Sequence, residues 1–142
     1  MTAVAAAHAA STLVMAGVVW TMQVVHYPLF SSVGRDGFTD YERRHTAAVT
    51  RLIAAPAVAE IITAAALFLA RPEPVPAWLP FWSGALLAGV WVMTAAVQAP
   101  AHGRLGSGFD PEVHRRLVRS NWVRTAVWSL RGAAALWMLA VL

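Results

Sequence analysis

The sequence contains no cysteine and no lysine, and only 13% of its 142 residues are charged. Without cysteine there can be no disulfide, no thiolate metal ligand and no cysteine nucleophile. Soluble domains carry about 25% charged residues, whereas here 58% of the residues are hydrophobic. A soluble domain of this size could not bury so much apolar surface. The shortage of charge therefore predicts a membrane protein.

Four stretches of the sequence are almost free of charge. No Asp, Glu, Lys or Arg occurs before Arg35 or between Glu73 and Arg104, while Glu60 and Arg131 are the lone charges inside the other two stretches. Each stretch supplies the roughly 20 apolar residues that a bilayer-spanning helix requires. We therefore predict one all-α domain, an antiparallel bundle of four transmembrane helices. The predicted spans are about residues 3–30, 38–70, 77–103 and 111–142.

The arginines predict how these spans are oriented. Nine of the eleven follow the first or the third span, and only Arg71 lies between the second and the third. The positive-inside rule places both basic regions in the cytoplasm and both termini outside, which fits a bacterial inner membrane protein. Because topology explains the basic charge, we expect the lipid bilayer rather than nucleic acid as the partner. A homodimer is left open.

The two halves of the chain resemble each other in the order of their residues. The first half holds His26, Leu29, Gly37, Phe38, Arg43 and Arg44, and the second holds His102, Leu105, Gly108, Phe109, Arg115 and Arg116. This shared order indicates two tandem hairpins related by an axis along the membrane normal. The alternative is a chance likeness between two Ala- and Val-rich hairpins.

Each predicted helix carries one stripe of polar residues at three- or four-residue spacing. Polar groups inside a membrane are energetically costly and usually face the bundle interior. All four stripes are richest near the cytoplasmic ends, so we expect a polar pocket there. The expected pocket residues are His26, His45, His102, His114, Glu42, Gln23, Gln98, Asn121 and Arg124, with Trp20, Trp91 and Trp128 as apolar walls.

The four histidines of this pocket are predicted metal ligands, because imidazole suits iron, copper and zinc. Glu42 and His45 have the three-residue spacing of di-iron bundle sites. Glu60, however, lies roughly 27 Å from Glu42 along a helix, so we expect a mononuclear transition metal, or a haem held between His26 and His102. The alternative is that these histidines only form hydrogen bonds near helix ends.

Glu60 and Arg131 are predicted to pair across the bundle. Glu60 is ten residues before Ala70 and Arg131 is eleven before Leu142, so their depths match. Either charge alone would cost about 2.5–3.5 kcal/mol at the middle of a membrane.

The first part of the last predicted span contains Asn121-Trp122-Val123-Arg124-Thr125, an Asn-x-x-Arg-Thr motif. With the four-helix layout, which covers nearly the whole chain, this motif resembles small bacterial membrane proteins grouped near the anthrone oxygenases. The resemblance implies that Asn121 and Arg124 orient an oxyanion or a carbonyl group.

The sequence thus predicts a membrane oxidoreductase or monooxygenase-like enzyme that acts on a lipophilic small molecule. The expected catalytic residues are Arg124, Asn121 and Glu42, and the expected cofactor-binding residues are Gln23, Gln98, Trp20 and Trp91. One alternative is a small transporter or carrier. The other is a structural membrane protein whose polar stripes only hold helices together.

Overall fold

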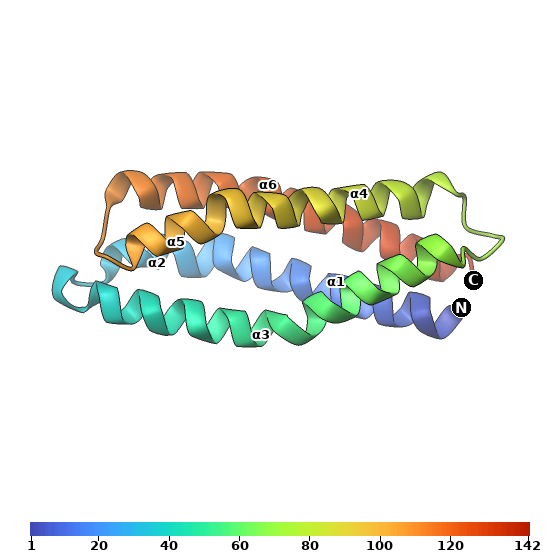
Figure 1. Ribbon diagram of the computed structural model, residues 1–142, viewed down its shortest axis with the longest axis horizontal. Helices are drawn as coiled ribbons and strands as arrows, with labels where there is room; N and C mark the ends of the chain where they lie inside the picture. The colour runs from blue at the N-terminus through green and yellow to red at the C-terminus, as the bar shows by residue number, and fades with distance from the viewer.

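The computed structural model describes all residues, 1–142, as helices and short connections without strands. Four helical rods lie side by side, and successive rods run in opposite directions (Figure 1). One end, called here the terminal end, holds both termini. The opposite end, called the arginine-rich end, holds the connections near residues 33–34 and 106–110.

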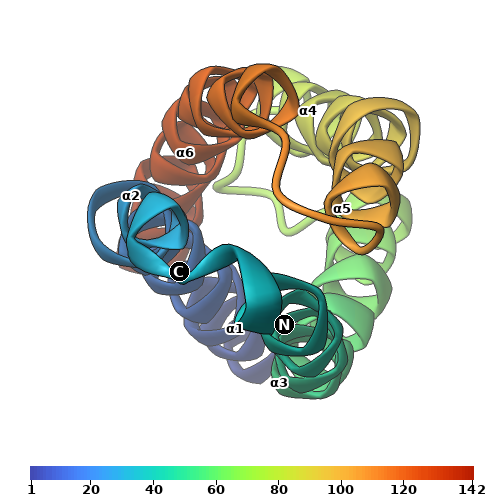
Figure 2. The same cartoon turned by 90° about the vertical axis from the view of Figure 1, so that its left-hand side faces the viewer.

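The helix bounds agree with the predicted stretches to within a few residues. The first rod comprises α1 (Thr2–Thr21), the π-helical segment η1 (Met22–His26), α2 (Tyr27–Leu29) and the 3₁₀ turn η2 (Phe30–Ser32). The second is α3 (Arg35–Leu69), the third is α4 (Trp78–Met93), the π-helical segment η3 (Thr94–Gln98) and α5 (Ala99–Leu105), and the fourth is α6 (Pro111–Ala140). Seen from the arginine-rich end, the rods occupy the corners of a square, with α1 and α4 each beside α3 and α6 (Figure 2).

Two of the rods depart from α-helical winding just before a proline. One residue separates the segment Met22–His26 from Pro28, and one residue likewise separates Thr94–Gln98 from Pro100. Proline has no amide hydrogen, and its ring crowds the carbonyl four residues earlier, which lies inside the π segment in both rods. The wider π turn accommodates that carbonyl, and such turns are frequent at functional sites. The first rod continues beyond Pro28 to Ser32.

α6 begins at a well-formed cap. Oδ1 of Asp110 accepts hydrogen bonds from the backbone N–H groups of Glu112 at 2.8 Å and Val113 at 3.1 Å. Pro111 occupies the first helical position, where its missing N–H has no cost. This cap fixes where the fourth rod starts at the arginine-rich end.

Three of the rods are long and apolar enough to cross a membrane: Thr2–Ser32, Arg35–Leu69 and Trp78–Leu105. Large apolar side chains on them face outward, including Ile62 at 62% and Val92 at 66% exposure. A soluble monomer rarely exposes apolar surface on this scale. The chain is therefore a helical membrane protein. α6, which carries five arginines, is not among these three rods.

The interior holds the two charges that interrupt the apolar stretches. Nη2 of Arg131 donates to Oε1 of Glu60 at 2.9 Å, and both side chains are fully buried. Nη1 of Arg131 donates to both oxygens of Ser83, and Nε1 of Trp128 donates to Oε2 of Glu60 at 3.2 Å. We call Glu60 and Arg131 the central ion pair.

Candidate functional site

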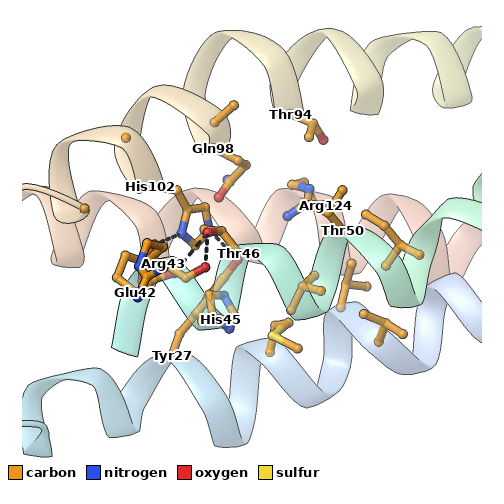
Figure 3. Close-up of a pocket in the computed structure, with 18 of the residues that line it drawn as sticks. Tyr27, Glu42, Arg43, His45, Thr46, Thr50, Thr94, Gln98, His102 and Arg124 are labelled. Carbon is orange, nitrogen blue, oxygen red and sulfur yellow. Dashed lines mark hydrogen bonds and ion pairs between the residues drawn. The ribbon is translucent and has the colours of Figure 1, made fainter. Parts of the chain in front are cut away.

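A cavity of about 610 Å³ lies between the first three rods and reaches Arg124 of the fourth (Figure 3). This volume falls in the usual range of small-molecule sites. Its inner wall is apolar and consists of Met15, Val18, Val19, Met22, Val49 and Ile53. Tyr27, Glu42, His45, Gln98 and His102 form its polar wall nearer the arginine-rich end, and Arg124 lies deeper, on the side of Thr50 and Thr94 (Figure 3). Thr50 and Gly103, which also line it, are exposed, so the cavity reaches the surface.

Three side chains in this wall form one hydrogen-bonded chain. Nδ1 of His102 lies 2.5 Å from Oε1 of Glu42, and Nε2 of His102 lies 3.2 Å from the Tyr27 hydroxyl. A carboxylate can only accept, so Nδ1–H donates to Glu42 and Nε2 accepts from Tyr27. The carboxylate thus fixes the tautomer and orientation of the ring, as in a catalytic triad.

Three polar atoms in the cavity wall have no hydrogen-bond partner: Oε2 of Glu42, Oε1 of Gln98 and Nε of Arg124. The side chains that carry them are 1%, 2% and 8% exposed. Buried polar atoms without partners are rare in folded proteins. These two acceptors and one donor belong to side chains that line the cavity, and each lies just beneath its surface, so a polar ligand group could satisfy them after a small side-chain shift.

Neighbouring residues hold two of these side chains in place. Nε2 of Gln98 donates to the Ser120 hydroxyl at 2.9 Å, which fixes the amide orientation. Nη1 of Arg124 donates to Oδ1 of Asn121 at 2.9 Å, and Nδ2 of Asn121 donates to Oε1 of Gln23 at 2.9 Å. Asn121 and Gln23, predicted as site residues, do not line the cavity. They position Arg124 from behind.

His26 and His45 contact each other. Nε2 of His26 lies 2.8 Å from Nδ1 of His45 and 3.2 Å from the Tyr41 hydroxyl, and the two imidazole rings are stacked at 4.6 Å. His45 lines the cavity, whereas His26 does not. The centre of the His45 ring is 5.4 Å from that of His102. His45 thus packs against both histidines that we expected to hold a haem.

The donor set does not fit the predicted metal. No group of three His, Asp or Glu side chains is arranged to hold a metal ion. The ring nitrogens of His26 and His45 contact each other, and those of His102 contact Glu42 and Tyr27. His114, the fourth predicted ligand, lies outside the cavity and has Nε2 2.8 Å from the backbone oxygen of Tyr27. The histidines instead form a hydrogen-bonding cluster, which was the alternative interpretation of the sequence.

The tryptophans expected at this site lie elsewhere. Trp20 is 43% exposed and donates to the Ser129 hydroxyl at 3.0 Å on the outside of the bundle. The π turn that starts at Met22 breaks the three-residue stripe, so Trp20 and Gln23 no longer share a face. Trp91 is half-buried, meets Trp128 edge to face and does not line the cavity.

Tyr27 is a residue of the cavity wall that none of the predicted polar stripes includes. It is one of only two tyrosines in the chain and directly follows His26. In the structure it is 3% exposed and its hydroxyl meets His102 from the third rod. Its position in the sequence between His26, a predicted ligand, and Pro28 could have indicated it, but Tyr27 is not part of the polar stripe of the first helix.

No family model, curated protein or solved structure matches the chain. The fold and the cavity together define its class: a helical membrane bundle with a polar-walled cavity near one end. The likeness to the anthrone oxygenase group stays a prediction, and function has to be argued from the site itself.

Proposed function

We propose that this protein is a membrane-embedded enzyme that transfers a proton to or from a lipophilic small molecule. The chain Glu42–His102–Tyr27 in the wall of the cavity is the observation that carries the proposal. A buried carboxylate behind a histidine is a recurrent way to make imidazole an effective general base. The apolar inner wall next to this chain favours a hydrophobic substrate body.

His102 is the residue that accepts the proton. Nε2 takes it from Tyr27, which in turn takes it from the substrate, or directly from a substrate that displaces the Tyr27 hydroxyl. Glu42 stabilises the imidazolium that forms, since its carboxylate already accepts from Nδ1. The same chain run backward protonates the product.

Arg124 binds the oxygen on which negative charge develops. Its Nε is buried and unpartnered, and Asn121 holds the guanidinium from the other side. A fixed donor aimed at a developing oxyanion contributes more to the rate than to ground-state binding. Oε1 of Gln98 accepts a hydrogen bond from a hydroxyl group on substrates that carry one.

Within this class, the reaction we propose is a monooxygenation, in line with the Asn-x-x-Arg-Thr resemblance. His102 and Tyr27 remove a proton from an acidic CH₂ group beside an aromatic ketone, and the resulting carbanion reacts with dioxygen. The CH₂ group and O₂ become C=O and H₂O, so the carbon is oxidised by four electrons and dioxygen is reduced by four. The protein contributes the base and the oxyanion partner.

The proposed membrane placement uses all four rods. The outer part of α6, residues 125–140, holds Arg131 as its only charge, and that charge is paired with Glu60. α6 would therefore complete a four-span antiparallel bundle, with the arginine-rich end in the cytoplasm and both termini outside. The matching π turns before Pro28 and Pro100 support two related hairpins.

The test is a reaction assay in lipid nanodiscs with anthrone, an aromatic ketone with an acidic CH₂ group. We expect air-dependent formation of anthraquinone, followed by its absorbance, and oxygen incorporation from ¹⁸O₂, followed by mass spectrometry. His102→Gln should lower the rate by about 100-fold or more, the usual contribution of a general base. Trp20→Phe, which changes a predicted site residue outside the cavity, should leave the rate unchanged.

A second readout separates the class of reaction from the oxidation. In D₂O without oxygen, the enzyme should exchange the CH₂ hydrogens of the ketone for deuterium, and Glu42→Gln should slow that exchange. Exchange without oxidation would support the proposal of a proton-transfer enzyme and contradict the proposal of a monooxygenase. Equal exchange by the protein, by His102→Gln and by empty nanodiscs would contradict the enzyme proposal.

A carrier is the second candidate, favoured by the polar contacts that continue beyond the cavity. The Arg124 guanidinium lies 5.3 Å from the centre of the Trp128 ring, and Trp128 bonds to Glu60 of the central ion pair. Polar groups thus extend from the cavity into the middle of the bundle. Uptake of a cavity ligand into proteoliposomes, without its conversion, would favour this role.

A further inference from the structure

A second groove lies on the outside of the bundle, between the third and fourth rods. It encloses about 150 Å³ and has an apolar floor with an arginine from each rod. The floor consists of Ala96, Val97, Pro100, Ala101 and Val113, and the arginines are Arg104 and Arg116. Ala96 and Val97 lie about two turns further from the arginine-rich end than Arg104. The groove is therefore apolar along its length and basic where it reaches that end.

A polar basin of about 410 Å³ adjoins this groove and shares Arg116 with it. The basin has no hydrophobic lining residue and consists of Glu112, Arg115, Arg116, Arg119 and Ser120. An apolar groove that ends in a basic basin matches an acyl chain joined to an anionic headgroup.

The arginines around the groove and basin differ from those of the other basic region. Arg104, Arg116 and Arg119 are exposed and form no salt bridge, and Arg115 alone is paired, with Glu112 at 2.9 Å. In the other basic region, Arg43 and Arg44 both pair with Asp40, while Arg35 and Arg51 form no salt bridge. Each region has four arginines outside the bundle interior, but three are without a salt bridge around the groove and basin and two in the other region.

We propose that the groove and basin bind one anionic phospholipid of the cytoplasmic leaflet. One acyl chain lies along Ala96, Val97 and Pro100, and the phosphate lies between Arg104 and Arg116. Unpaired arginines beside a membrane attract anionic lipid, and the adjoining apolar groove favours a lipid over a free anion. The proposal uses the membrane orientation given above and does not depend on the chemistry of the cavity.

The experiment compares nanodiscs of phosphatidylcholine alone with nanodiscs that also contain phosphatidylglycerol. Thermal unfolding is followed by tryptophan fluorescence, and retained lipid is counted by native mass spectrometry. We expect phosphatidylglycerol to raise the Tm and to remain as a single adduct. Arg104→Gln with Arg116→Gln should weaken retention about 30-fold, from the typical contribution of two arginines near a membrane surface. The matched control, Arg43→Gln with Arg44→Gln, should retain the lipid.

A third variant and a soluble anion separate a lipid from its headgroup. Val97→Trp fills the groove without changing charge and should also remove the adduct, whereas inorganic phosphate added to phosphatidylcholine nanodiscs should not raise the Tm. An equal rise of the Tm with inorganic phosphate would mean that the site binds a free anion rather than a lipid, and would contradict the proposal. Equal loss of the adduct in both double-arginine variants would reduce the effect to general surface charge and overturn the proposal.

Discussion

Two buried polar regions of this bundle differ in how their charges are partnered. In the central ion pair, Glu60 accepts from both Arg131 and Trp128, and Arg131 also donates to Ser83. One atom there, Nε of Arg131, lacks a partner, and neither charge lines the cavity. The protein itself supplies nearly every hydrogen bond that these charges require.

The cavity wall has the opposite character. Glu42, Gln98 and Arg124 line the cavity, and each uses one end for a hydrogen bond within the protein and leaves another buried polar atom without a partner. Internally matched charges hold rods together, whereas side chains that line a cavity and keep an unmatched polar atom can still bind a ligand. The contrast favours a structural role for the central pair and fits the ligand-binding role that we propose for the cavity.

Breaking the central pair should produce the largest loss of stability. Arg131→Met leaves Glu60 charged and unpaired in the interior, which typically costs about 3–5 kcal/mol. Glu60→Met should cost a similar amount, while the double substitution should recover much of the loss. Denaturant unfolding followed by tryptophan fluorescence measures all three variants. If the two single losses simply add in the double variant, the residues are not coupled.

Asn121→Ala should have the next largest effect on stability. Asn121 forms buried hydrogen bonds within the protein and also supports Arg124 in the cavity wall. The substitution removes the bonds from Asn121 to Gln23 and Arg124 and leaves those partners buried, at about 1–3 kcal/mol of unfolding free energy. It should also weaken ligand binding, since Arg124 loses its support. Thr125→Val is the control, because the Thr125 hydroxyl bonds only within α6, and its loss should be smaller.

Much of the fold could be predicted because apolar stretches and helix caps are local features. Uncharged runs located the rods, and Asp110 with Pro111 located the start of α6. The π turns could not be predicted from the 3.6-residue period, since they arise from how Pro28 and Pro100 displace a carbonyl in the preceding turn. The π turns also give a different alignment of the two halves. When Pro28 is matched with Pro100, His26 corresponds to Gln98, whereas the order of residues in the sequence matched His26 with His102.

The candidate site was only partly predictable, because a helical stripe gives the face of a residue but not its partner. Glu42, His45, Gln98, His102 and Arg124, chosen for their stripes, do line the cavity. Asn121 and Gln23 share those stripes but face a neighbouring helix. Whether histidines converge on a metal or bond to one another depends on rod spacing and side-chain rotamers, which sequence spacing does not encode.

Gln98→Met should have the smallest effect on stability. Unlike the substitutions above, it should not lower the free energy of unfolding. Methionine has nearly the shape of glutamine and removes the unpartnered Oε1, while the Ser120 hydroxyl keeps its bond to the Leu117 carbonyl. Removing the unpartnered Oε1 offsets the loss of the bond from Nε2 to Ser120, so the net effect should be neutral or stabilising by less than about 1 kcal/mol. The same change should weaken binding of a hydroxylated ligand, measured by quenching of tryptophan fluorescence. A clear loss of stability would instead mean that Gln98 belongs with the central ion pair, as a structural residue whose needs the protein already meets.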